Sequence, residues 1–380
     1  MHICYVCPEY PPAPHGGIGS FTQTLAREFV RRGHRVTIAG NYPGLVREEE
    51  QDQGVRVVRL GFGSIPALRF ATKRMMLASE LRRIHAEHNI DILEGGELDL
   101  AIAFRSLPGH SVLRMHGGPT VFASTPKPSR VASLLERWSF SSAQHLAAVS
   151  SFVAETTRRL LHLKDRPITV IPNPVDVDLF SPAPEVPEEP HLIVFTGTVT
   201  ERKGIRELLA AMPAILREVP SARLAVYGGD AIGGSGKPLM KALASSLPAG
   251  ISGHVEWKGR VAREDLPAAL RRASVCVYPS YIEAMPIGWI EGMACGKAVV
   301  ASRTGPGPEL IDDGVTGLLC DPYDPASIAG RILLALKDAD LRRRLGSAAR
   351  QTAVERYSLA PLVERNLAYY RQILGSAGIG

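Results

Sequence analysis

Cysteine is scarce in this sequence of 380 residues, which contains five. Small secreted domains held together by disulfides are dense in cysteine, so that class is excluded. Cys4 and Cys7 do form a C-x-x-C pair. The pair lies in a strand-like segment, however, where side chains at odd separation point to opposite faces. We therefore expect structural cysteines here rather than a redox or metal motif.

Long apolar runs are also missing. No stretch approaches the ~20 apolar residues that a membrane-spanning helix needs. The first residues, MHICYVCPEY, lack the basic leader, apolar stretch and cleavage site of a signal peptide. These two absences lead us to expect a cytoplasmic protein.

Neither sign of charge dominates. The formal net charge of +6, with 22% charged residues, fits an anionic ligand or an acidic membrane surface without requiring either. The basic residues are dispersed and no nucleic-acid-reading motif occurs, so we expect no nucleic-acid partner. A hydrophobic content of 45% is typical of an ordinary globular protein.

What the chain does contain is a regular alternation of strand-like and helical patterns, which predicts parallel sheets covered by helices on both faces. Its length exceeds what one hydrophobic core usually supports, which favours two domains. A proline-rich stretch without periodicity, 173–190, interrupts the series. The expected strands cover 2–7, 34–39, 55–60, 91–95, 111–115, 145–150 and 168–173 before the interruption, and 191–197, 223–229, 254–259, 274–280, 297–302 and 317–320 after it.

The fold class that we predict is therefore α/β, with two consecutive doubly wound, Rossmann-like domains. We expect the first domain over 1–175, the second over 176–355, and a final helix over 356–380 that packs back towards the first domain. Two such domains facing each other across a cleft would direct the carboxyl ends of both sheets to one ligand site.

The loop after the first expected strand is rich in glycine. Gly16, Gly17 and Gly19 permit close backbone approach, and a helix should follow with Ser20 as its N-cap. Free amides at a helix start favour an anion or a sugar hydroxyl, while a turn without a ligand is the alternative. The nicotinamide fingerprint G-x-G-x-x-G fails at its third glycine, which disfavours a dinucleotide site.

Two other strand ends carry candidate functional residues. His116 stands where a strand gives way to two glycines, and its imidazole can donate or accept a proton near neutral pH. Arg202 and Lys203 follow the first strand of the second half and precede a helix expected near Ile205. Two cations just before a helix suit a polyanion such as a phosphate ester. A solvated basic turn is the alternative explanation of the same residues.

The segment EAMPIGWIE contains two carboxylates eight positions apart. Glu283 belongs to the loop after an apolar strand, and Pro286 suits the first turn of a helix that continues past Glu291. The amides around Pro286, Ile287 and Gly288 would form a positive helix terminus between the two acids. A phosphate could bind these amides while each carboxylate accepts hydrogen bonds from hydroxyls, which is the pattern of a sugar nucleotide.

With these motifs, almost the whole chain resembles the family 4 glycosyltransferases of the GT-B fold. The family's E-x7-E signature is met by Glu283 and Glu291, and the stretches GRVAREDLPAALRRASVCVYPS, ACGKAVVASRTGPGPELIDDGVTGLLCDP and VIPNPVDVDLF follow the family closely. The resemblance implies a retaining transferase that moves a sugar from a nucleotide diphosphate sugar to an acceptor hydroxyl. It makes the first domain the acceptor side and the second the donor side.

The resemblance also implies roles for the residues. Glu283 would contact hydroxyls of the transferred sugar, Glu291 the ribose, and Arg202 with Lys203 the diphosphate, whose developing charge they would stabilise. His116 would lie beside the donor sugar, so His116 and Glu283 are the expected catalytic residues. The other residues expected to bind the donor are Gly16, Gly17, Arg260, Pro286, Ile287 and Gly288.

Neither a metal nor a cofactor is implied, and a UDP- or GDP-linked sugar is the expected donor. Asp176 with Asp178 and Asp338 with Asp340 match a D-x-D pattern. Both pairs lie outside the expected strand-end loops and should be solvated turns. Many family members read E-x-F-G where this chain has Met285 and Pro286, which leaves the donor sugar open.

Basic stretches in the first domain bear on the acceptor. Arg69, Lys73, Arg74, Arg82 and Arg83 alternate with apolar residues over 66–85, and the stretch 125–138 is similar. A basic amphipathic helix can lie on an anionic membrane, which would suit a lipid-linked acceptor and place the protein at the inner face of the membrane. A solvated basic face over a packed apolar face is the alternative.

Four rival functions use the same residues differently. A sugar-nucleotide epimerase or a phosphorylase could share the architecture, and a non-catalytic protein could bind sugar nucleotides. A glycosidase acting through the two glutamates would leave the cationic pair and the glycine loop without a task. The sequence leaves open the base, the sugar, the acceptor and the oligomeric state.

Overall fold

The computed structural model describes residues 1–376 except 15, 45, 62–65, 103–106, 123–129, 164–165 and 232–237. The chain divides into two compact units. Unit 1 comprises Met1–Asn173 and Ala360–Gly380, and unit 2 comprises Pro174–Leu359.

Unit 1 is built on an eight-stranded sheet of order β3-β4-β2-β1-β5-β6-β7-β8. Neighbouring strands are parallel except for β3 and β4, which are antiparallel. β1 is buried along its whole length, as expected of a central strand covered on both faces. The strands are β1 (His2–Val6), β2 (Arg35–Asn41), β3 (Glu48–Asp52), β4 (Val55–Leu60), β5 (Ile92–Gly95), β6 (His110–Met115), β7 (His145–Ala148) and β8 (Ile168–Val170).

The helices of unit 1 pack on this sheet through apolar residues at helical spacing. In the first helix, Phe21, Leu25 and Phe29 recur every four residues and are buried. The helices are α1 (Gly17–Arg31), α2 (Pro66–Glu87), α3 (Arg130–Ser142), α4 (Ser151–Leu161) and, from the end of the chain, α13 (Leu359–Ser376).

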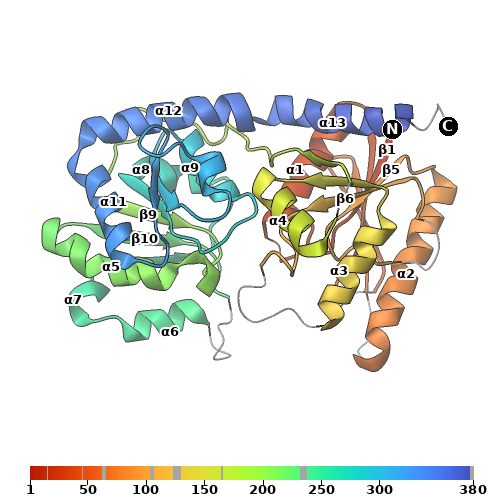
Figure 1. Ribbon diagram of the computed structural model, residues 1–380, viewed down its shortest axis with the longest axis horizontal. Helices are drawn as coiled ribbons and strands as arrows, with labels where there is room; N and C mark the ends of the chain where they lie inside the picture. The colour runs from red at the N-terminus through yellow and green to blue at the C-terminus, as the bar shows by residue number, and fades with distance from the viewer. Residues whose placement is uncertain are drawn as a thin grey trace. The chain divides into compact units, whose positions relative to one another are not determined.

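Figure 1 shows α13 in blue in unit 1, and a buried polar network fastens this helix to the strands. Arg114 on β6 pairs with Glu94 on β5, with Nε 2.6 Å from Oε1. The same guanidinium donates to Asn366 Oδ1 at 2.7 Å, and the Tyr370 hydroxyl donates to Glu94 Oε2 at 2.7 Å. Tyr5 on β1 completes the network, its hydroxyl 3.0 Å from that of Tyr370. The last helix is therefore held by hydrogen bonds to charged groups as well as by apolar packing.

Unit 2 is built on a six-stranded parallel sheet of order β11-β10-β9-β12-β13-β14. The strands are β9 (Leu192–Thr196), β10 (Arg223–Tyr227), β11 (Val255–Gly259), β12 (Val275–Tyr278), β13 (Ala298–Ser302) and β14 (Leu318–Cys320). The helices are η1 (Glu201–Lys203, a 3-10 turn), α5 (Ile205–Glu218), α6 (Leu239–Ser246), α7 (Ala249–Ser252), α8 (Leu266–Arg272), α9 (Ile287–Ala294), α10 (Gly307–Leu310), α11 (Pro325–Lys337) and α12 (Ala339–Tyr357).

The strands of unit 2 face helices on both sides, because alternate side chains point to opposite faces. Ile193 and Phe195 join one core with residues of α5, α6 and α11. On the other face, Gly292 of α9 lies against Cys276 and Val299, and a Cβ at Gly292 would be 3.5 and 3.4 Å from their side chains. Figure 1 shows α5 and α11 together in this unit, α5 in green and α11 in blue.

The predicted α/β class with two Rossmann-like sheets is confirmed. The sequence analysis missed β3, whose residues EEEQD are all polar and carry no strand pattern. This edge strand is stabilised instead by ion pairs, such as Arg56 Nε to Glu49 Oε1 at 2.7 Å. The expected N-cap Ser20 is wrong, because α1 begins four residues earlier than expected, at Gly17, and has Gly16 as its N-cap.

Candidate functional site

Glu283 in unit 2 lies between the two predicted cations. Its Oε1 is 2.5 Å from Lys203 Nζ, and its Oε2 is 3.1 Å from Arg202 Nη1. The Glu283 side chain is 7% exposed, against 20% for Lys203 and 36% for Arg202. Burial opposes ionisation of Glu283, but the two cations outweigh it and hold its pKa below the ordinary value. The carboxylate is therefore charged at neutral pH.

A glycine brings these residues together. Gly204 follows η1 with φ +66°, a left-handed conformation that favours glycine. A Cβ on Gly204 would lie 1.9 Å from the carbonyl oxygen of Pro279, so the turn packs directly on the loop after β12. The Tyr281 amide then donates to the Arg202 carbonyl at 2.9 Å. Since β9 and β12 are neighbouring strands, the ends of both reach the same edge of the sheet.

The predicted helix terminus is present at α9, which has Pro286 as its N-cap and no acidic residue in its first turn. A Cβ on Gly288 would lie 3.3 Å from the hydroxyl oxygen of Thr196 at the end of β9. The absence of a side chain there lets the first turn, with Ile287, pack close to the strand end. Amides at a helix start point out of the helix and favour an anion.

Glu291 on α9 is also buried, with 5% of its side chain exposed. Burial raises its pKa above the ordinary value, and Arg263, whose Nη1 is 2.9 Å from Oε1, acts in the opposite direction. The sequence analysis selected Arg260 rather than Arg263. Arg260 is exposed and its guanidinium lies along Gly229, where an added Cβ would be 3.4 Å from Nη2.

The glycine loop of unit 1 already holds a carboxylate. Glu9 Oε1 accepts hydrogen bonds from the Gly19 amide at 2.7 Å and from the Gly16 amide at 3.3 Å. Gly17 and Ile18 begin α1 beside them. An anion that binds this helix start must therefore compete with Glu9 or use the neighbouring amides, a restriction that the glycine pattern did not reveal.

His116 directly follows β6. Its amide donates to Glu97 Oε1 at 2.7 Å, and its ring meets that of Phe21 edge to face, with 5.0 Å between centroids. Burial, with a further contribution from Arg114, lowers the pKa of His116 to about 3. The imidazole is therefore neutral at physiological pH, so it can act as a hydrogen-bonding group but not as a cation.

Two buried acids flank the glycines after His116, and the sequence analysis found neither. Burial raises the pKa of Glu97 to about 8, and nearby Glu136 contributes. Glu136 accepts hydrogen bonds from the amide and the hydroxyl of Thr120. Gly118 lies between the acids: a Cβ there would be 2.3 Å from Glu136 Oε1 and 3.0 Å from the Glu97 side chain. A glycine next to a histidine was visible in the sequence, but nothing indicated its acidic neighbours.

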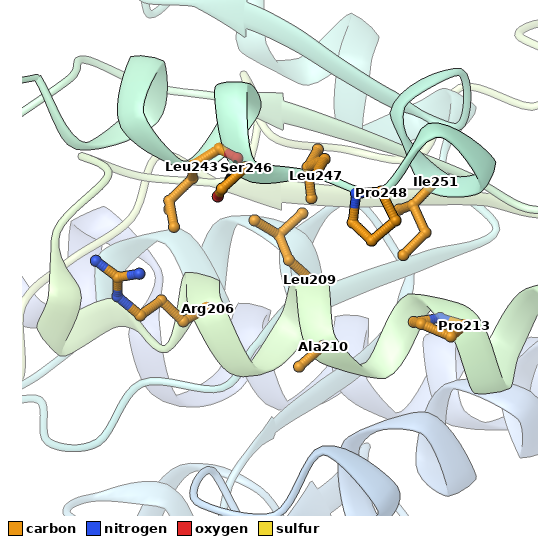
Figure 2. Close-up of a pocket in the computed structure, with 9 residues that line it drawn as sticks. All are labelled: Arg206, Leu209, Ala210, Pro213, Leu243, Ser246, Leu247, Pro248 and Ile251. Carbon is orange, nitrogen blue, oxygen red and sulfur yellow. Dashed lines mark hydrogen bonds between the residues drawn. The ribbon is translucent and has the colours of Figure 1, made fainter.

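Cavities among the described residues lie apart from these side chains, including one in each unit. In unit 2, a cavity of about 250 Å³ separates α5 from α6 and α7, and Figure 2 shows Leu209 of α5 below Leu243 and Leu247. It is mostly apolar and contains none of the predicted site residues. In unit 1, a cavity of about 210 Å³ lies at the strand ends beside α2. Its lining is Pro8, Asn41, Lys73, Arg74, Leu77, Leu98, Asp99, Ala101 and Ile102.

The first aspartate of each D-x-D pair accepts hydrogen bonds from the backbone, and Asp340 pairs with Arg343. Asp338 caps α12 by accepting from the Leu341 amide at 2.8 Å, and Asp176 accepts from the Leu179 amide at 3.0 Å. Within the described residues, no three His, Cys, Asp or Glu side chains gather as a metal site would require.

In the part of the chain that the structure describes, no helix combines the length and apolar character that a membrane crossing requires.

Comparison with known proteins covers nearly the whole chain. Residues 176–352 match the family described as "Glycosyl transferases group 1", and residues 15–179 match "Glycosyltransferase Family 4". A relative in Mycolicibacterium smegmatis, the GDP-mannose-dependent alpha-(1-6)-phosphatidylinositol monomannoside mannosyltransferase, is 29% identical over 375 residues, which cover 92% of this chain and 93% of the relative.

Solved structures have the same fold. Sucrose-phosphate synthase of Thermosynechococcus elongatus superimposes with a TM-score of 0.86 at 21% identity, covering 99% of this chain and 100% of that one. Anabaena HepE in complex with UDP-glucose superimposes with a TM-score of 0.75 at 17% identity, covering 99% and 100%. With the two sheets and the E-x7-E spacing, these matches show that the chain belongs to the family 4 glycosyltransferases, retaining enzymes of the GT-B fold that use nucleotide sugars as donors.

Proposed function

We propose that unit 2 binds a GDP- or UDP-linked sugar through Arg202, Lys203, Glu283 and the first turn of α9. The cluster of two cations and one buried carboxylate carries this proposal, because its formal charge is 2 − 1 = +1 beside a helix N-terminus. A net positive site next to free amides suits a diphosphate. The carboxylate of Glu283, between the two cations, can accept hydrogen bonds from the hydroxyls of the attached sugar.

In the proposed reaction the bond between the sugar's anomeric carbon and the diphosphate breaks, and negative charge grows on the leaving phosphate. Lys203 and Arg202 stabilise that charge, and the amides of Ile287 and Gly288 add to it. Glu283 stays ionised because of the same two cations, so it accepts hydrogen bonds from sugar hydroxyls. The acceptor oxygen forms the new bond to the anomeric carbon, and an oxygen of the leaving donor phosphate takes the proton of the acceptor hydroxyl.

The remaining predicted residues take supporting roles in this proposal. Glu291 accepts from the ribose hydroxyls and Arg260 contacts the nucleotide. His116, neutral at pH 7 because of its lowered pKa, donates or accepts one hydrogen bond at the transferred sugar. Gly16 and Gly17 approach the substrate through their backbone.

We further propose a lipid acceptor with an anionic headgroup. The cavity beside α2 offers Lys73 and Arg74 next to the apolar Leu77 and Leu98, which suits a charged group attached to an apolar one. On the same helix Met75 is 67% exposed, and exposed apolar side chains beside cations suit an anionic lipid surface. The mannosyltransferase of M. smegmatis is named for an acceptor of this class. The side chain of Arg69 and residues 125–129, also expected to contribute, lie outside the described part.

Nucleotide release tests the donor and the acceptor together. The enzyme is incubated with GDP-mannose or UDP-glucose and with vesicles of phosphatidylcholine, with or without phosphatidylinositol. We expect nucleotide release from one donor, accelerated by phosphatidylinositol, and a glycosylated lipid in the product. Release that depends only on a soluble acceptor would contradict the lipid part, and no release with any donor and acceptor would contradict the whole proposal.

A further inference from the structure

We infer that Arg263 is a positioning residue for the donor. Arg263 holds the buried carboxylate of Glu291 in place, and the ring of Phe180 packs against the guanidinium of Arg263. The inference rests on the proposed function, because the ligand of Glu291 is taken to be the ribose of a nucleotide sugar. It adds a residue that neither the E-x7-E spacing nor the cationic pair identifies.

Three separate segments of unit 2 meet at Arg263. The residue lies between β11 and α8, and its Nη1 is 2.9 Å from Glu291 Oε1 on α9. Its guanidinium carbon lies 5.1 Å from the ring centroid of Phe180, which belongs to the segment of unit 2 before β9 and is fully buried. A guanidinium stacked on an aromatic face is restricted in direction. The positive charge of Arg263 is therefore held in a fixed direction next to one oxygen of the Glu291 carboxylate.

The contact leaves Glu291 able to bind a ligand. An ionised carboxylate accepts at about four lone-pair positions. Arg263 approaches the carboxylate at one oxygen, Oε1, at 2.9 Å, so accepting positions remain for a ligand. The Glu291 side chain is 5% exposed, and a hydroxyl that donates to the remaining accepting positions of a buried carboxylate stabilises it.

Arg263 also determines the charge of this acid. Burial raises the pKa of Glu291, and Arg263 opposes the rise. Tyr278 on β12 and Cys295 after α9 also interact with Glu291. Burial raises the pKa of Tyr278 well above its ordinary value and that of Cys295 to about 12, so both stay neutral below pH 9. Removal of Arg263 should therefore raise the pKa of Glu291 further and protonate it at mildly acidic pH.

The test is calorimetric titration with GDP, UDP, GDP-mannose and UDP-glucose from pH 5.5 to 8.5. The variants are Arg263→Met, Arg263→Lys and the matched control Arg272→Met, which removes an exposed arginine of α8 that pairs with Glu189. We expect Arg263→Met to bind at least about tenfold more weakly at pH 6, equivalent to about one pKa unit. The deficit should narrow towards pH 8.5, because Glu291 regains its charge. Arg263→Lys should recover most of the affinity, and Arg272→Met should match the wild type.

A second variant separates charge from packing. In the double variant Glu291→Gln/Arg263→Met the pH dependence should disappear, because the titrating group is gone. A deficit of Arg263→Met that is equal at every pH, or no deficit at all, would overturn the inference. If the wild type binds none of the four ligands, the proposed function fails instead, so the two failures are distinguishable.

Discussion

Lys203 Nζ lies 2.5 Å from Glu283 Oε1, although the two residues are 80 positions apart in the chain. One follows β9 and the other follows β12, and these strands are neighbours in a parallel sheet. Open α/β sheets bind ligands at the carboxyl ends of their strands. The pair therefore lies at the edge of the sheet where this type of fold binds its ligands.

Replacement of Lys203 by Met should reduce catalysis much more than stability. One of the two cations that stabilise the leaving phosphate is lost, so kcat/KM should fall about 10²–10³-fold. Arg202 still neutralises Glu283, which should keep the protein folded. Arg206→Met is the matched control, since Arg206 is exposed and pairs with Glu201. Initial rates of nucleotide release measure the effect, and similar rates for the two variants would refute the role of Lys203.

Gly204→Ala should destabilise unit 2 by about 2–4 kcal/mol, because the left-handed backbone and the close approach to Pro279 both exclude a Cβ. Gly330→Ala in α11 is the control: nothing lies within 4 Å of the added Cβ, and alanine should stabilise the helix by about 0.5–1 kcal/mol. Urea unfolding measures both variants. Opposite signs are expected, and equal midpoints would contradict the described turn.

Glu97→Gln should change how stability depends on pH. Because the pKa of Glu97 is raised to about 8 from 4.5, its stabilising contribution is complete below pH 4.5 and is lost as pH rises through 8. Between pH 5 and 8 the melting temperature of the wild type should therefore fall relative to that of Glu97→Gln. Above pH 8.5 the difference between the two melting temperatures should stay constant. Asp99 and Glu136 also interact with this site, but they titrate in both proteins. Parallel curves over the whole range would show that Glu97 is charged at neutral pH.

Arg114→Met should cost about 3–5 kcal/mol, because Glu94 is left charged and buried without its cation. The double variant Glu94→Gln/Arg114→Met should recover part of this loss, since the uncompensated charge is removed. Chemical unfolding monitored by far-UV circular dichroism checks the cycle. If the double variant is less stable than Arg114→Met, the buried pair is not what holds β5 and β6 to α13.

The sequence predicted what depends on local pattern. The alternation of strands and helices follows from periodicity, and Pro286 indicated a helix start that the structure places one residue later, at Ile287. Gly16 as an N-cap was missed because the cap comes from Glu9, seven residues upstream, beyond the reach of any local capping rule.

Contacts between distant segments were not predictable. Arg260 and Arg263 look equivalent in the sequence, and only the path of the loop after β11 decides which one reaches Glu291. Glu97 lies in a strand-end loop and Glu136 in α3, with 38 residues between them. No sequence pattern predicts that both acids are buried around Gly118. Such residues become visible only when the fold gives their neighbours.

The central claim is that Glu283 binds the hydroxyls of the sugar while the two cations and the N-terminus of α9 bind the diphosphate. A comparison of the affinities for sugar nucleotides and for free nucleotides tests it most directly. Calorimetric titration of the wild type and of Glu283→Gln with GDP-mannose, UDP-glucose, GDP and UDP provides the comparison. A hydrogen bond to a charged group contributes ~1.5–3 kcal/mol, so Glu283→Gln should bind the preferred sugar nucleotide about 10–100-fold more weakly and the matching free nucleotide at least as well as the wild type does. Equal losses for both ligands, or no loss for either, would contradict the account.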